Sequence, residues 1–75
     1  MISVNSRLAL AIRRTNAEYA KLDQAAQDSI ELAPIVALER KVDLAMAAGD
    51  DPAAFAAIEA WERECLRIFK EAARG

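Results

Sequence analysis

Histidine is absent from this 75-residue sequence, and cysteine, glycine and proline are scarce. Without histidine, the chain lacks the commonest general base and metal ligand. Cys65 is the single cysteine, so neither an internal disulfide nor a cysteine–histidine zinc site can form. The two glycines, at positions 49 and 75, cannot make a glycine-rich phosphate loop. We therefore predict no catalytic residues, no cofactor and no metal site.

Long apolar segments are missing as well. No run of residues is apolar enough to span a bilayer, and Arg7, Arg13 and Arg14 interrupt the region where a signal peptide would be apolar. The net charge of −2 gives no overall attraction to nucleic acid or to an anionic membrane. We expect a cytoplasmic protein with no membrane contact. Abundant alanine and an excess of arginine over lysine are typical of GC-rich bacteria and of their phages or plasmids.

The clearest structural signal is a helix over residues 52–74. Gly49 can end a preceding helix in the left-handed conformation, Asp51 can cap the next helix, and Pro52 suits its first position. The apolar arc is roughly 160° wide, so this helix is expected to contact two neighbours. Its members recur at spacings of three and four: Phe55, Ile58, Trp61, Cys65, Ile68, Phe69 and Ala72.

Glu62 interrupts this apolar arc. It could be a flexible side chain that reaches past the apolar edge to water. It could instead form a buried ion pair with an arginine of the first helix, or act as a functional acid. We favour the first interpretation, and we expect Cys65 on the same arc to be a small core residue.

Two further helices are predicted, over about residues 6–28 and 31–48. Pro34 separates them, because it disfavours a helical conformation at Ala33. One long kinked helix is the alternative. The inner face of the first helix has the spacing of a coiled-coil seam: Leu8, Ile12, Thr15, Tyr19, Leu22 and Ala26. The inner face of the second comprises Leu32, Ile35, Leu38, Val42, Ala45 and Met46.

The fold class predicted from these patterns is all-α, with residues 1–75 forming a single domain. The expected architecture is a small three-helix bundle or a kinked helical hairpin, with helices over about 6–28, 31–48 and 52–74. The first helix carries its arginines early and Asp23 and Asp28 late, against its own dipole. Parallel packing on the 52–74 helix would offset this, because Arg67, Lys70 and Arg74 would lie beside the two aspartates.

Protein binding is the function that these patterns favour. A chain this short has a small core, so burial against a second copy would add stability, and we predict a homodimer. The first hypothesis is a non-enzymatic helical module that binds and modulates another protein, as an adaptor, chaperone or phage- or plasmid-type inhibitor does. The contact is predicted to use exposed or flanking apolar residues: Leu10, Leu44, Trp61, Leu66 and Ile68.

The alternative is a nucleic-acid-binding accessory protein. It would use the basic face of the first helix, where Arg7, Arg13 and Arg14 could contact an anion. Nucleic-acid-binding proteins usually gather more basic residues on one face, often together with aromatic ones. The aromatic residues here fall on inner faces, which disfavours nucleic acid as the partner.

Overall fold

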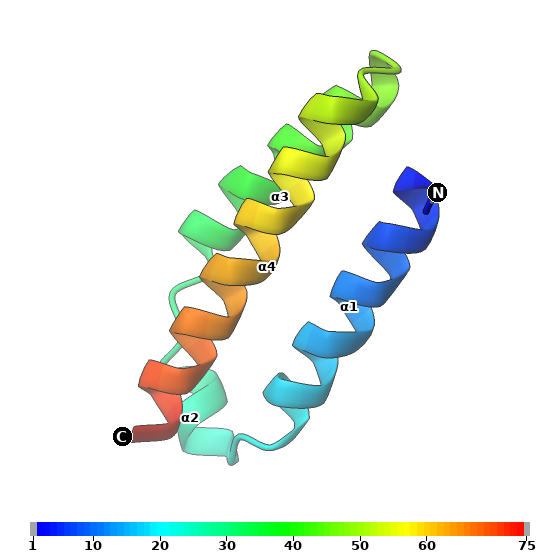
Figure 1. The fold of residues 1–75 in the computed structure, drawn as a ribbon. Helices are drawn as coiled ribbons and strands as arrows, with labels where there is room; N and C mark the ends of the chain where they lie inside the picture. The colour runs from blue at the N-terminus through cyan, green and yellow to red at the C-terminus, as the bar shows by residue number, and fades with distance from the viewer. Residues whose placement is uncertain (1, 75) are drawn as a thin grey trace.

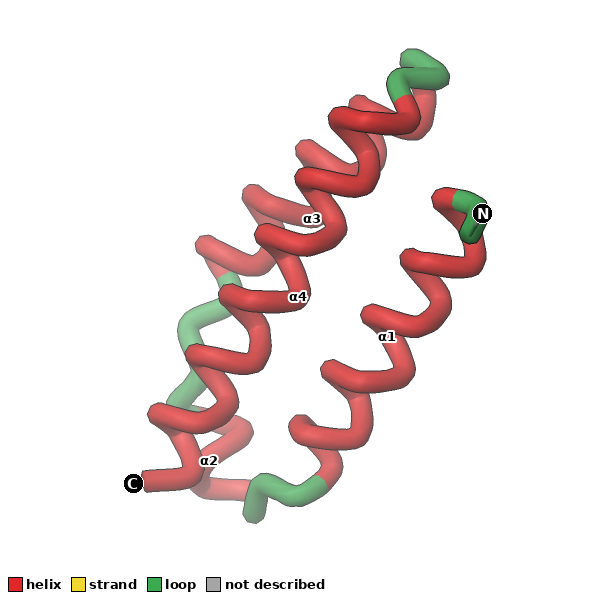
Figure 2. The backbone as a smooth tube through the Cα atoms, viewed as in Figure 1, coloured by secondary structure: helices red, strands yellow, loops and turns green. Residues whose placement is uncertain are grey.

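The computed structural model describes residues 2–74 and confirms the all-α class (Figures 1 and 2). The helices are α1 (Val4–Ala20), α2 (Gln24–Asp28), α3 (Ala33–Ala47) and α4 (Asp51–Arg74). The described part of the chain contains no strand. α1 begins after Ser3, whose hydroxyl accepts a hydrogen bond from the backbone N–H of Ser6 at 3.1 Å. None of these helices is both long and apolar enough to cross a membrane.

The helix predicted over 6–28 is divided in two, so that prediction was wrong at residues 21–23. α1 ends at Ala20, and the Asp23 carboxylate accepts a hydrogen bond from the N–H of Ala26 at 2.8 Å. Asp23 therefore caps a new helix instead of continuing the old one. The Gln27 amide also donates to the Leu22 carbonyl at 3.2 Å, which holds the turn against α2. This break also excludes one kinked helix running through residues 6–48.

The turn between α3 and α4 is the hairpin that the sequence indicated. Gly49 has a φ of +70°, and its N–H donates to the Met46 carbonyl at 3.1 Å. Asp50, one residue earlier than predicted, caps α4 by accepting from the N–H of Ala53 at 3.2 Å. α3 starts at Ala33, so the expectation that Pro34 keeps Ala33 out of a helix was wrong. Pro34 is tolerated at the second helical position because it still lies in the first turn, where no N–H is needed.

α4 is the central helix of the fold. α1 and α3 each pack along its length from different sides, and α2 lies against its C-terminal end. α1 and α4 are parallel, since Asn5 lies near Pro52 at one end and Leu22 lies near Ala72 at the other. α3 is antiparallel to both (Figure 1). The parallel packing predicted from the charges is therefore confirmed.

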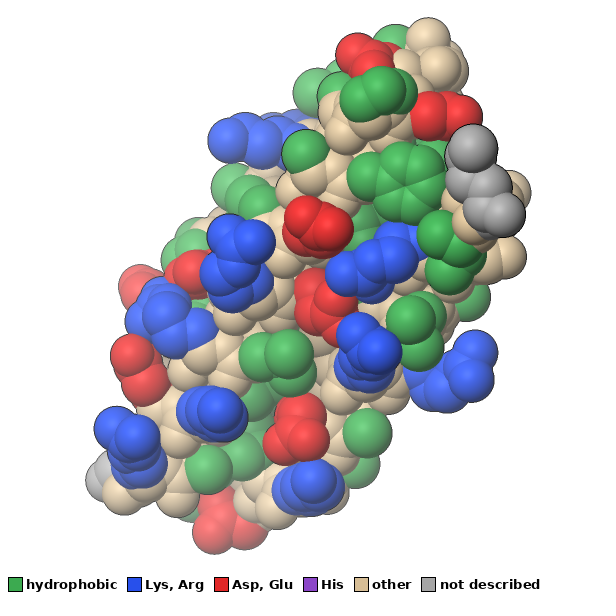
Figure 3. Space-filling view, viewed as in Figure 1, with side chains coloured by type: hydrophobic (Ala, Val, Ile, Leu, Met, Phe, Trp, Pro, Cys, Tyr) green, Lys and Arg blue, Asp and Glu red, His purple; other side chains and the backbone are tan. Residues whose placement is uncertain are grey.

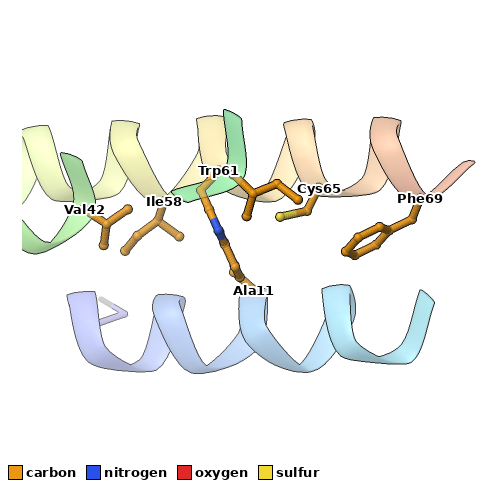
Figure 4. Packing of buried hydrophobic residues seen from close by; sticks show 7 residues of the cluster. Ala11, Val42, Ile58, Trp61, Cys65 and Phe69 are labelled. Atoms are coloured by element: carbon orange, nitrogen blue, oxygen red, sulfur yellow. The ribbon is translucent and has the colours of Figure 1, made fainter. Parts of the chain in front are cut away.

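The hydrophobic core follows α4 between its two neighbours. Trp61 reaches from α4 towards Ala11 on α1, and Ile58 and Cys65 are fully buried beside it (Figure 4). This confirms the stripe predicted for residues 52–74 and the core position of Cys65. The buried apolar residues are Ala11, Ile35, Val42, Ala54, Ile58, Trp61, Cys65 and Phe69.

The inner face of α1 differs from the predicted seam. Ala11 is completely buried, whereas Ile12 is 42% exposed. The large indole of Trp61 fills the space opposite α1, so a small side chain is required there. Thr15 is buried as predicted, and its hydroxyl donates to the Ile12 carbonyl at 3.0 Å. α1 is thus rotated so that Ile12 lies at the edge of the core.

The three long helices form a slab, with principal extents of 39 × 23 × 14 Å. α1 and α3 both pack on α4 but have at most marginal contact with each other. A compact three-helix bundle would close all three helix–helix contacts. Here the side between α1 and α3 stays open, and this opening positions the candidate site.

Candidate functional site

A surface groove lies between α1 and α3. Leu8 and Ile12 line it from α1, and the edge of Trp61 lines it from α4. Val42 lines the α3 side, where Glu39 and Asp43 add two carboxylates. The groove therefore combines an apolar floor with an acidic rim on one side. It occupies the position that a fourth helix would take in a four-helix bundle.

Exposed apolar side chains continue the groove along both helices. Tyr19 lies two turns after Ile12 on α1, and it is 39% exposed. Leu32, the residue before α3, and Val36 on α3 precede Glu39 at helical spacing, and they are 61% and 45% exposed. Isolated exposed apolar residues are common, whereas several exposed apolar residues along the two sides of one groove are a candidate binding surface. We call this group the open face; its members are Leu8, Ile12, Tyr19, Leu32, Val36 and Trp61.

The structure does not bring the five predicted contact residues together. Trp61 is buried and reaches the open face only with its edge, while Leu44 is 65% exposed but lies outside the groove. Leu10 is half-buried. Leu66 is half-buried beside Arg7 and Arg14, and Ile68 is half-buried against the core.

Sequence reasoning missed the residues that do cluster. Ile12 and Leu32 were assigned to inner faces, and Val36 to no contact surface. Tyr19 was also assigned to an inner face, and its ring does pack on Phe69 of α4, with ring centroids 5.4 Å apart, although part of it stays exposed. Their positions on apolar stripes were read correctly, but a stripe does not reveal how far apart the helices lie. The exposure of these residues follows from the spacing between α1 and α3.

A buried ion pair joins α1 to α4. Arg7 Nη2 donates to Glu62 Oε1 at 2.6 Å, with only 16% and 8% of the two side chains exposed. Arg14 Nη1 lies 3.7 Å from the other carboxylate oxygen. The favoured interpretation of Glu62, a side chain reaching to water, was therefore wrong, and the ion-pair interpretation is confirmed. The reason is that Glu62 faces parallel α1, which places Arg7 within reach.

This ion pair leaves polar atoms without partners. Arg7 Nη1 and Glu62 Oε2 are buried and make no hydrogen bond within residues 2–74. An ion pair of this kind depends on both members, because either one alone would be an uncompensated buried charge. It links the first turn of α1 to the middle of α4.

The three arginines predicted as anion contacts do not form one free basic patch. Arg7 is held by Glu62, and Arg14 lies beside the same carboxylate. Arg13 is exposed. Figure 3 shows basic and acidic side chains interspersed over the face that carries α1 and α4.

The charges near the C-terminal end of α4 pair within that helix. Arg67 forms ion pairs with Glu64 and, at 2.9 Å, with Glu71. The hydrogen bond from Arg67 lowers the pKa of Glu64 below its ordinary value. The charge pattern had led us to expect Arg67 beside Asp23 and Asp28, but Arg67 pairs with neither. Such exposed pairs contribute little to stability.

Cys65 is a buried thiol of low reactivity. Burial is the largest cause that raises its pKa to about 11, and the nearby negative charges of Glu39, Glu64 and Glu62 raise it further. The thiolate is the nucleophile and metal ligand, so a raised pKa suppresses both kinds of chemistry. Across residues 2–74, no group of three or more acidic or cysteine side chains is placed to hold a metal ion.

Comparison of the chain with protein-family models, with curated proteins and with solved structures finds no match. The functional interpretation therefore depends on the open face and on the chemistry of the side chains around it.

Proposed function

We propose that this protein is a non-enzymatic helical interaction module that binds and modulates another protein chain through the open face. The observation that supports the proposal is the groove lined by Leu8, Ile12 and Trp61, together with the exposure of Tyr19, Leu32 and Val36 along its two sides. A groove between two helices is a common docking site for a third helix, which places apolar side chains at one face into it. Adaptor, chaperone and inhibitor are three roles that such binding can serve.

The burial of the charged groups supports a binding role over catalysis. Glu62 is the one inward-facing carboxylate on α4, and Arg7 neutralises it in a closed contact. An acid held in this way stabilises the fold and is not offered to a substrate. The nucleic-acid alternative loses Arg7 from its contact set for the same reason, so we retain it only as an outcome of the test.

The test is affinity capture from lysate with three forms of the tagged chain. Val36→Asp places a charge on the open face, and Leu44→Asp places the same charge on the same helix outside the groove. We expect the wild type and Leu44→Asp to retain one bound protein in stoichiometric amount, and Val36→Asp to lose it. Circular dichroism of both variants controls for loss of helix.

Two results would contradict the proposal. Equal capture by Val36→Asp and the wild type would show that the open face is not the binding surface. Capture that disappears after nuclease treatment would point instead to nucleic acid, which exposed arginines such as Arg13 could contact, with steep dependence on salt.

A further inference from the structure

We propose that the partner on the open face is a second copy of this chain, with α1 of each copy packed on α3 of the other. This inference rests on the proposed function, because it names the protein that the open face binds. Two α1 helices and two α3 helices would then form a four-helix bundle at the centre of the dimer, with one α4 on each outer side. The predicted homodimer would thus have a defined interface.

The exposed surface of the single chain is larger than its mass predicts. A compact monomer of 8.2 kDa is expected to expose about 4,500 Å². The chain exposes 5150 Å², an excess of about 600 Å². One subunit buries about 800 Å² in a typical stable interface, so covering one face would remove an excess of this size. The open face is the flat side where the third helix–helix contact is missing.

The open face changes in character along the helices. The groove places Ile12 level with Glu39 and Asp43. Tyr19 comes seven residues after Ile12, and Leu32 comes seven residues before Glu39. Because α1 and α3 are antiparallel (Figure 1), both are displaced from this level by about two turns in the same direction. The lower end of the face is therefore apolar, and its middle carries the carboxylates.

This pattern selects one of two symmetric arrangements. A two-fold axis parallel to the helices leaves the position of each residue along the helices unchanged. Tyr19 of one copy then lies at the same height as Leu32 of the partner subunit and meets it. An axis across the helices, at the level of Glu39 and Asp43, would place α3 on α3 and bring these carboxylates of both copies together. Like charges facing each other across an interface are strongly disfavoured. The axis along the helices avoids this.

The same arrangement brings opposite charges together. With the axis along the helices, the carboxylates of Glu39 and Asp43 face α1 of the partner subunit near the level of Ile12. Arg13 follows Ile12 directly, about 100° further round α1 and outside the groove, and is exposed. Arg13, Glu39 and Asp43 form no ion pair with any of the described residues 2–74 of their own chain. Their charges are therefore available to a second copy, and by symmetry the contact occurs twice.

Sedimentation equilibrium of the full chain tests the proposal. We expect a mass twice the 8.2 kDa of one chain at about 100 μM, a concentration that detects micromolar dissociation constants. Val36→Asp should weaken the dimer about a hundredfold, because the substitution is present in both copies, and Leu44→Asp should not.

Charge reversal gives a test that does not depend on the stability of one variant. Arg13→Glu alone, or Glu39→Arg with Asp43→Arg, should each weaken the dimer about tenfold. All three substitutions together should restore it, because the same pairs form with their signs exchanged. Restoration would be specific to α1 packed on α3 of another copy.

The failures of the two proposals are distinguishable. A chain that is monomeric at about 100 μM, or a dimer unaffected by Val36→Asp and by charge reversal, would overturn the second-copy assignment. Protein binding through the open face would still stand if capture from lysate were lost with Val36→Asp and kept with Leu44→Asp. If capture were also insensitive to Val36→Asp, both proposals would be wrong.

Discussion

The Arg7–Glu62 ion pair permits a double-mutant test of how this fold is held together. Glu62→Leu removes the acid and leaves the guanidinium of Arg7 buried close to that of Arg14. Removing one member of a buried pair typically costs about 3–5 kcal/mol. Arg7 retains 16% exposure, so water can partly solvate it, and we expect a loss of about 2–4 kcal/mol. This is a large part of the stability of a 75-residue chain, about 4–11 kcal/mol.

The companion variants decide the origin of that loss. Arg7→Met should cost a similar amount, because it leaves Glu62 as the unpaired charge. The double variant should lie near the wild type or above it, since apolar side chains of similar volume often replace a buried ion pair without loss. We therefore expect a coupling free energy of at least about 2 kcal/mol between the two positions.

Urea denaturation at one protein concentration measures these free energies, with Trp61, the single tryptophan, as fluorescent probe. Glu64→Gln is the matched control, because its pair with Arg67 is exposed and such pairs contribute little to stability. The reasoning is refuted if Glu62→Leu and Arg7→Met each cost no more than this control and their effects simply add in the double variant.

Two further predictions concern the core around Trp61. The pKa of the Cys65 thiol is about 11 in the folded state, against an ordinary value of 9.0. The folded state therefore favours the protonated thiol, and the free energy of unfolding gained in this way is complete below pH 9.0 and is lost as the pH rises through about 11. Urea denaturation between these pH values should show that the wild type loses up to about 3 kcal/mol of unfolding free energy and that Cys65→Ala does not. An equal dependence of this free energy on pH in both forms would contradict the prediction. Ala11→Leu should cost about 1–3 kcal/mol, because Ala11 is fully buried opposite Trp61, and thermal unfolding that matches the wild type would show that the site has spare volume.

The local features of the fold were predictable from sequence. The stripe from Phe55 to Phe69 and the turn at Gly49 are set by residues close together in the chain. The parallel packing of α1 on α4 was also predictable, because the charge gradients of the two helices are opposite. Asp23 was missed as a cap since its helix appeared continuous by periodicity, although an aspartate can always start a new helix.

The open face was not predictable by the same reasoning. Ile12 is displaced from the core because Trp61, far along the chain, requires alanine at position 11. The exposure of Leu32 and Val36 depends on α1 and α3 staying apart, and no helical stripe encodes that spacing. Glu62 illustrates the same limit, since its partner Arg7 is 55 residues away.

The central position of α4 has a consequence for the synthesis of the chain. Translation produces α1, α2 and α3 before α4, yet α1 and α3 pack on α4 and scarcely on each other. Until α4 has left the ribosome, the apolar faces of the earlier helices have no partner in their own chain. This tertiary structure can therefore form only after α4 has been translated.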